Sequence, residues 1–195
     1  MFALRRNPDG ANVFWPLFLV IVCMALMTPS QALGQEANEA MIQATRKGDI
    51  LTVKELLSQG ASVEATDNLG NTALTCAVEN GQDECAKVLI ENGAMVNTRS
   101  YNGYSPLILS TIKGLQETAR MLIDKGADVN ATDPYGWTAL MNAVYLGDVQ
   151  MVKLLLDRGT DVNHRNYLGR SALFIAINTG RLDITRMLKE AGAVE

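Results

Sequence analysis

The 195-residue sequence has few of the side chains from which catalytic or metal sites are built. It contains one histidine, His164, for which we expect a solvated side chain, and three cysteines, with no metal-ligand spacing among them. A nucleophilic pair of Cys85 and His164 is excluded, because these residues fall in repeat units about two layers apart. Adjacent helices are spaced by ~8–10 Å, so the two side chains are too far apart to exchange a proton. Phosphate-cradling G-x-x-x-x-G-K and nucleophilic G-x-S-x-G elements are missing. We therefore expect no enzymatic activity, no metal and no cofactor.

Basic residues are also few and dispersed. The chain has 17 Lys and Arg against 21 Asp and Glu, and a formal charge of −4. Phosphate binding requires a clustered basic face, so nucleic acid is excluded as a partner. Beyond the amino-terminal segment only Cys76 and Cys85 remain, too few for a disulfide-rich secreted domain. We expect two buried thiols, with a disulfide between them as the alternative.

Long apolar runs are limited to one, at the amino terminus. Two arginines precede the apolar residues 13–27, and small and polar residues follow. This order predicts a secretory signal peptide over residues 1–34, with cleavage after Gly34 or, alternatively, after Ala32. The run is shorter than the ~20 residues of a permanent membrane span. An uncleaved anchor is the competing interpretation, because the charge-free stretch continues to Gln35.

Glycine, in contrast, is plentiful and periodic. Three series of glycines recur at a step of 33 residues, as from Gly103 to Gly136. The positions are 70, 103, 136 and 169; 48, 81, 114, 147 and 180; and 60, 93, 126, 159 and 192. A period of this size indicates a stack of small supersecondary units, none of which buries its apolar face alone.

The period divides a repeat domain over residues 35–195 into units. Cutting before the recurrent Asp gives the units 67–99, 100–132, 133–165 and 166–195, preceded by an incomplete unit without an opening turn, 37–66.

Within one unit the local chemistry predicts a fixed order of elements. Gly136 stands where a tight turn needs a positive φ, and Thr138 is a helix N-cap candidate. A first helix then ends at Gly147, and a second helix with apolar residues at helical spacing ends before Gly159. Each unit is therefore expected to run turn, helix, turn, helix, loop.

These elements resemble the ankyrin repeat family. The family pattern runs D-x-x-G-x-T-P-L-H-x-A, then a Gly, a leucine-rich second helix and G-A-D-V-N. Residues 105–107, Ser-Pro-Leu, come nearest to T-P-L, and residues 126–130 match G-A-D-V-N in full. The resemblance covers residues 37–195. It implies an all-α ankyrin-repeat solenoid of helix–turn–helix units with β-turn fingers, about five repeats including caps.

The sequence departs from the family pattern at one recurrent position. The histidine after T-P-L is replaced by Thr75, Ile108, Met141 and Phe174. We expect its hydrogen bonds to be missing or replaced by apolar contacts. The incomplete first unit and the short last unit suit caps, whose outer faces meet water.

The resemblance also implies where a partner binds. In this family the turn tips and the ends of the first helices form a concave face, in which Arg46 is one of the corresponding positions. Six of the seven aromatic residues after residue 35 fall on such positions, and Phe174 is the exception. Exposed Tyr and Trp are typical of binding hot spots. The predicted protein-binding residues are Tyr101, Tyr104, Tyr135, Trp137, Tyr145, Leu146, Tyr167, Arg170, Ile112 and Lys113.

The expected function is recognition of another protein. The resemblance suggests an exported bacterial protein of the periplasm, or a secreted one, that binds its partner as a monomer and protects or inhibits it. One alternative is a scaffold tethered to the inner membrane by residues 13–27. Another is a structural role, in which the rings at the turn tips stack on one another and stiffen the turns.

Overall fold

The computed structural model describes residues 29–194. The chain divides into two compact units, residues 1–36 and 37–195. Most of the predicted signal peptide lies outside the described residues, and its last residues form part of the first described helix. Residues 29–194 contain helices, turns and isolated bridges but no strand, which confirms the all-α fold.

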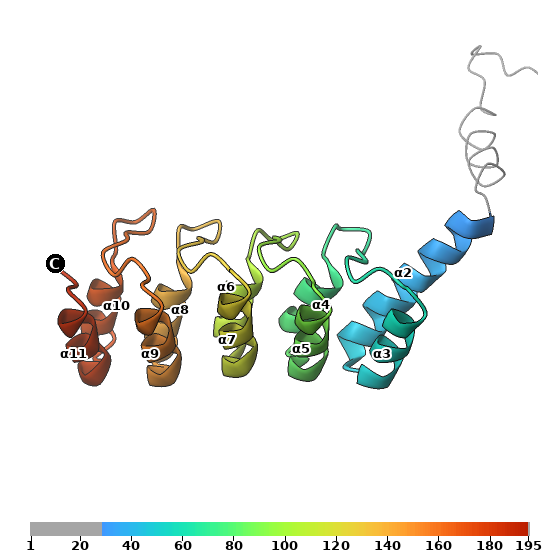
Figure 1. Cartoon of the computed structure of the whole chain (residues 1–195). Helices are drawn as coiled ribbons and strands as arrows, with labels where there is room; N and C mark the ends of the chain where they lie inside the picture. The colour runs from blue at the N-terminus through green and yellow to red at the C-terminus, as the bar shows by residue number, and fades with distance from the viewer. Residues whose placement is uncertain (1–28, 195) are drawn as a thin grey trace, which may run out of the picture. The chain divides into compact units, whose positions relative to one another are not determined.

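The described residues form ten helices in five pairs (Figure 1). The first helices of the pairs are α2 (Pro29–Lys47), α4 (Ala73–Glu79), α6 (Pro106–Lys113), α8 (Ala139–Leu146) and α10 (Ala172–Asn178). The second helices are α3 (Ile50–Ser58), α5 (Asp83–Glu91), α7 (Gln116–Asp124), α9 (Val149–Asp157) and α11 (Leu182–Glu190).

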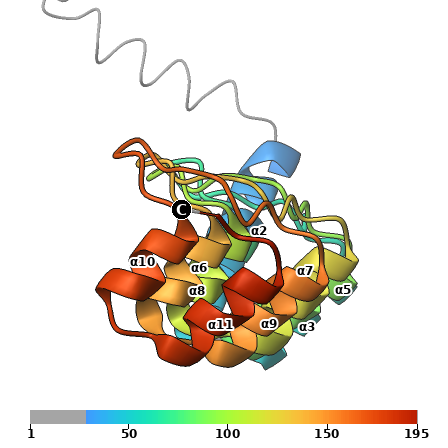
Figure 2. The same ribbon diagram turned by 90° about the vertical axis from the view of Figure 1, so that its left-hand side faces the viewer.

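Within residues 37–195 the helices form two layers. First helices lie in one layer and second helices in the other, and the turns project as fingers along one edge (Figure 2). First helices of neighbouring finger-bearing units pack more closely on one another than the second helices do. The closer packing of the first helices agrees with the expectation that the first helices and the fingers form the concave face.

The helix ends follow the predicted caps. The N-cap residues of α4, α6, α8 and α10 accept the backbone N–H three residues on, and they are Thr72, Ser105, Thr138 and Ser171. At α8 the Met141 N–H lies 3.3 Å from the Thr138 hydroxyl. The helix ends at Gly147, whose φ of 76° is rare for residues with a side chain. The predicted turn–helix–turn–helix order is confirmed.

Equivalent leucines form the core between the layers. Each is at most 1% exposed: Leu74, Leu107, Leu140 and Leu173 in the first helices, and Leu89, Leu122, Leu155 and Leu188 in the second. Full burial of such a side chain stabilises the fold by about 1.5–3 kcal/mol. Because they face neighbouring helices, the stability of each unit depends on the units beside it.

The position of the family histidine is filled as expected in the inner units. Ile108 and Met141 are fully buried, so apolar contacts replace the hydrogen bonds of a histidine. Thr75 is also buried, and its hydroxyl donates to the Thr72 carbonyl oxygen at 2.8 Å.

The outer face of the last unit meets water, as expected of a cap, and it exposes apolar side chains. Phe174 and Ile177 are about half exposed, although the equivalent Met141 and Val144 are buried. No further unit follows α11 in the described residues to cover these side chains.

A ladder of side-chain-to-backbone hydrogen bonds joins consecutive units. At each step a side-chain oxygen accepts a backbone N–H of the next unit's loop at 2.7–2.9 Å. We call the four accepting residues the interunit ladder: Glu64, Asn97, Asn130 and Asn163. Their N–H donors are those of Met95, Asp128, Asp161 and Val194.

The ladder predicts a specific loss of stability. Asn130 accepts the Asp161 N–H at 2.8 Å and the Thr160 hydroxyl at 3.2 Å. Asn130→Ala should lower the free energy of unfolding by about 1–2 kcal/mol, because the Asp161 N–H loses its acceptor and the Thr160 hydroxyl keeps only the Val129 carbonyl oxygen at 3.5 Å. Urea unfolding followed by circular dichroism measures this. The control is Asn102→Ala, an exposed finger position, and an equal loss in both variants would contradict the role of the ladder.

Candidate functional site

Each finger is organised around the side chain at its first position. In the third finger, Asp133 Oδ1 accepts the backbone N–H groups of Tyr135 at 2.8 Å and Trp137 at 2.9 Å. The Asp133 N–H in turn donates to the Trp137 carbonyl oxygen at 2.9 Å. Gly136 reverses the chain with a φ of 77°. These bonds fix the finger and thereby the starting points of both aromatic side chains.

The three tyrosines at the finger tips are the most exposed aromatic residues of the described chain. Tyr101, Tyr135 and Tyr167 are 68%, 66% and 77% exposed. In residues 29–194 none of them forms a ring–ring pair with another aromatic side chain. The Tyr167 ring does pack on the neighbouring finger, where a Cβ built at Gly136 would come within 2.8 Å of it. Stacking of one tip ring on the next is therefore not observed among these residues.

The other two finger aromatics point inward. Tyr104 and Trp137 are partly buried and pack against the core. Burial raises the pKa of the Tyr104 hydroxyl, with smaller contributions from Asp133 and Tyr135. Trp137 meets Tyr145 edge to face, with ring centroids 5.8 Å apart and planes at 89°. Such pairs are worth about 0.5–1.5 kcal/mol beyond their buried area.

The predicted positions on the first helices lie at the carboxyl-terminal ends of α6 and α8. Tyr145 and Leu146 are 57% and 47% exposed, and Ile112 is 38% exposed beside an exposed Lys113. These helices begin at the fingers and end away from them, but Tyr145 still meets the Trp137 ring of its own finger and lines the same pocket, so the structure brings it together with the finger aromatics.

A pocket of about 450 Å³ opens between the last two finger-bearing units. One wall comes from the finger and first helix of the fourth unit, with Tyr135, Trp137 and Tyr145, and Asp133 also lines it. The opposite wall includes Arg170 and Phe174, whose guanidinium carbon and ring centroid are 5.8 Å apart. The volume lies within the range of about 300–1,000 Å³ that is typical of ligand sites.

Phe174 belongs to this site although the sequence did not assign it there. The three equivalent residues of inner units are at most 1% exposed, whereas Phe174 is 46% exposed and lines the pocket. Its place in the last unit of the described array is the one signal that could have identified it, because a covering unit is needed to bury this position.

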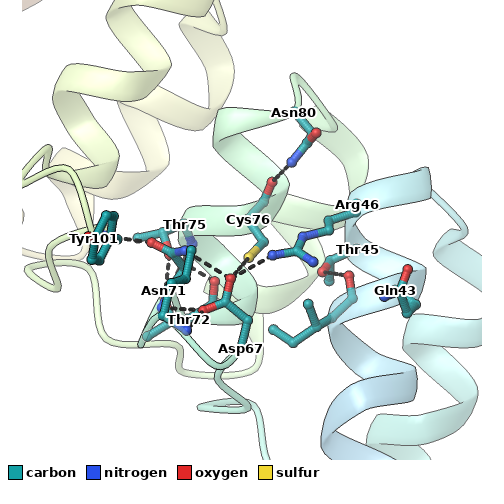
Figure 3. A network of polar contacts seen from close by, with 12 residues as sticks. Gln43, Thr45, Arg46, Asp67, Asn71, Thr72, Thr75, Cys76, Asn80 and Tyr101 are labelled. Carbon is teal, nitrogen blue, oxygen red and sulfur yellow. Dashed lines mark hydrogen bonds and ion pairs between the residues drawn. The ribbon is translucent and has the colours of Figure 1, made fainter.

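The amino-terminal part of the same face is occupied by an internal ion pair (Figure 3). Arg46 Nη2 lies 2.6 Å from Asp67 Oδ2, which also accepts the Asn71 amide at 2.8 Å. Burial tends to raise the pKa of the Asp67 carboxyl, but hydrogen bonds from Asn71 and Leu69 and the charge of Arg46 hold it below its usual range. Arg46, a position transferred from the family, thus serves the fold.

The remaining reactive side chains serve the fold as well. Cys76 and Cys85 are buried free thiols, as expected, and burial raises the pKa of Cys76 to about 11.

The prediction that His164 is a solvated side chain is wrong. The residue is partly buried, and its Nε2 lies 3.0 Å from the Gly136 carbonyl oxygen of the preceding finger. Within residues 29–194 no group of three or more His, Cys, Asp or Glu could hold a metal ion.

Comparison with protein families agrees with this architecture. The family model for ankyrin repeats (3 copies) matches residues 40–133 and again residues 130–194. The chain belongs to the ankyrin repeat family. None of the curated proteins compared with it matches.

Ankyrin repeats are generally non-catalytic modules that bind other proteins. This ankyrin repeat protein is accordingly a candidate interaction module, and the face formed by its fingers and first helices is the candidate binding surface.

Among the helices of residues 29–194, none has both the length and the apolar character required to cross a membrane.

One finger of the array contains an unsatisfied polar group. Asn166 is 4% exposed, and its Oδ1 accepts the N–H groups of Leu168 and Arg170, each at 3.0 Å. Its amide nitrogen Nδ2 is buried without a hydrogen-bond partner. At the equivalent position Asp133 accepts the same two backbone bonds with a carboxylate, which has no donor to satisfy.

The orphan donor predicts a stabilising substitution. Asn166→Asp should raise the free energy of unfolding at pH 7 by about 1 kcal/mol, because it removes the buried donor and retains both accepted bonds. Thermal or urea unfolding measures the change. Asn102→Asp adds the same charge at an exposed finger position and serves as the control. A lower stability of Asn166→Asp than of this control would contradict the assignment.

Proposed function

We propose that this ankyrin repeat protein is exported and binds a protein partner through its concave face, protecting or inhibiting it. The observation that carries the proposal is the set of exposed aromatic and apolar side chains around the pocket of the fourth and fifth units. The binding residues are those predicted from the sequence, centred on Tyr135, Trp137 and Tyr145, with Phe174 added.

The exposure of these residues supports partner binding over a purely structural role. Tyr135 and Tyr145 each leave more than half of their side chain in water, where an apolar ring contributes little to folding. Large rings with few rotatable bonds lose little entropy on binding, so they are favoured at hot spots. The edge-to-face contact of Tyr145 with Trp137 further restricts both rings and prepares them for a partner.

The position of the face supports recognition of a protein. The exposed residues extend over three successive units, from Tyr101 and Ile112 to Tyr167 and Arg170. Such an extended concave surface is typical of solenoid proteins that bind other proteins. The proposed mechanism is stoichiometric binding by one copy of the chain, without catalysis.

Export is supported by the order of residues at the amino terminus. Arginines, an apolar run and small residues follow one another as in a secretory signal. The compact repeat unit begins at Ala37, shortly after the proposed cleavage site at Gly34. The proposed location is a bacterial periplasm or the medium. The alternative, an inner-membrane tether, predicts a membrane-bound chain with an intact amino terminus.

Affinity capture from a native envelope extract tests the binding face. The wild-type chain should retain a partner that Tyr135→Ala/Tyr145→Ala loses, because the two exposed tyrosine rings that line the pocket are removed. This pair is preferable to a substitution of Trp137, which also packs against the core. Circular dichroism and thermal unfolding verify that the variant is folded.

A matched control removes apolar area elsewhere. Leu51 and Leu182 are 76% and 79% exposed on the second helices α3 and α11. Leu51→Ala/Leu182→Ala should capture the partner as the wild type does. If the tyrosine variant also keeps the partner, the assignment of the concave face is wrong.

A further inference from the structure

Asp67 and Asp133 occupy equivalent positions in two fingers, but their carboxylates differ in the side chains that donate to them. Asp67 and Asp133 both use Oδ1 to accept the backbone N–H groups two and four residues on. The second oxygen of Asp67 receives the Arg46 guanidinium at 2.6 Å and the Asn71 amide at 2.8 Å (Figure 3). The second oxygen of Asp133 has no hydrogen-bond or ion-pair partner in residues 29–194, although this residue is only 6% exposed.

The repeat explains the difference. The position equivalent to Arg46 in the unit before Asp133 is Ile112, and the position equivalent to Asn71 is Trp137. The chain has thus kept the carboxylate and replaced its arginine and asparagine donors with isoleucine and tryptophan. The weak third donor, Cys76 Sγ at 4.0 Å from Asp67 Oδ2, corresponds to Asn142, whose amide donates to the Thr138 carbonyl oxygen instead. Among residues 29–194 the one buried side-chain N or O atom without a partner is Asn166 Nδ2, so Asp133 Oδ2 keeps contact with solvent and can accept a donor from outside the chain.

Asp133 is part of the pocket between the fourth and fifth units. Asp133 lines it together with Tyr135, Trp137 and Tyr145. Aromatic faces attract cations, most often the guanidinium of arginine, within about 6 Å of the ring centroid. The Trp137 and Tyr145 rings, at 89° to each other, line the same pocket as this carboxylate, so one site offers a planar guanidinium both an aromatic face and a carboxylate acceptor.

We propose that the protein partner inserts an arginine side chain into this pocket, with its guanidinium at Asp133 Oδ2. The arginine takes at Asp133 the place that Arg46 takes at Asp67. This inference rests on the proposed function and names the chemical group that the concave face recognises. Arginine is preferred over lysine because its planar group both stacks on a ring and donates several hydrogen bonds.

The chain's own arginine at this site does not fill the position. Arg170 lines the pocket from the fifth unit, with its guanidinium carbon 5.8 Å from the Phe174 ring centroid. Among the described residues it forms no ion pair with Asp133. Asp133 is therefore left without an ion-pair partner among these residues.

The test uses N-acetylarginine methylamide as a probe for the full-length chain. The indole N–H signal of Trp137, assigned with Trp137→Phe, reports on the pocket in ¹H–¹⁵N spectra. We expect a saturable shift with the arginine probe, at least tenfold weaker binding of the lysine analogue, and no binding of the neutral citrulline analogue. Equal binding of either analogue would overturn the proposal.

The decisive variant is Asp133→Asn, which removes the charge and keeps the Oδ1 acceptor. Asn166 shows that the finger accepts an asparagine at this position. The variant should weaken binding of the arginine probe at least tenfold. Asp128→Asn, on the loop before the same finger, removes the same charge outside the pocket and should bind like the wild type. Unchanged binding by Asp133→Asn would overturn the inference.

Partner capture separates this inference from the proposed function. Loss of the partner by Asp133→Asn as well as by Tyr135→Ala/Tyr145→Ala supports both. Capture retained by Asp133→Asn and lost by the tyrosine variant overturns the arginine site and leaves the binding face intact. Capture retained by both variants overturns both.

Discussion

The fold depends on contacts between units, because no single helix pair can bury its own apolar faces. The recurrent leucines of each pair are covered only when the next pair stacks beside them. Apolar burial alone does not fix how one unit is oriented on the next. The hydrogen bonds of the interunit ladder do, because they require a defined geometry between donor and acceptor. Each of its four oxygens holds the loop of the following unit through a backbone N–H, so the spacing between units is fixed as well as their contact.

The concave face inherits its geometry from this stacking. Asp133 fixes its own finger through two backbone N–H groups, and His164 of the next loop bonds to the Gly136 carbonyl oxygen. Tyr135, Trp137 and Tyr145 therefore project from a framework that is set before a partner arrives. Preorganisation of this kind lowers the entropy lost on binding, since fewer groups remain to be ordered.

Much of the architecture could be predicted from the sequence because the same turn, cap and helix signals recur in every repeat unit. The glycine period, the hydroxyl N-caps and the apolar spacing of the helices agree with one another, and the structure contains each of these elements. The 33-residue register of the repeat also predicted which positions lie at the finger tips and at the ends of the first helices. Their role in binding a partner stays a prediction.

The remaining features depend on which side chains meet across units, and one sequence does not reveal this. Phe174 occupies a position that is buried in inner units and becomes part of the pocket only because no unit covers it in the described chain. Arg46 has the register of a binding residue but pairs with Asp67 of the next unit. His164 was predicted to be solvated, yet its partner is a carbonyl oxygen 28 residues earlier in the chain.

Hydrogen–deuterium exchange of the chain, with and without its captured partner, tests the central claim most directly. Exchange reports local opening of the backbone, and partner contact suppresses that opening. We expect slower exchange in the third and fourth fingers and at the carboxyl-terminal ends of α8 and α10, with little change in α9 and α11. Protection confined to the second helices or to residues 37–66 would contradict it.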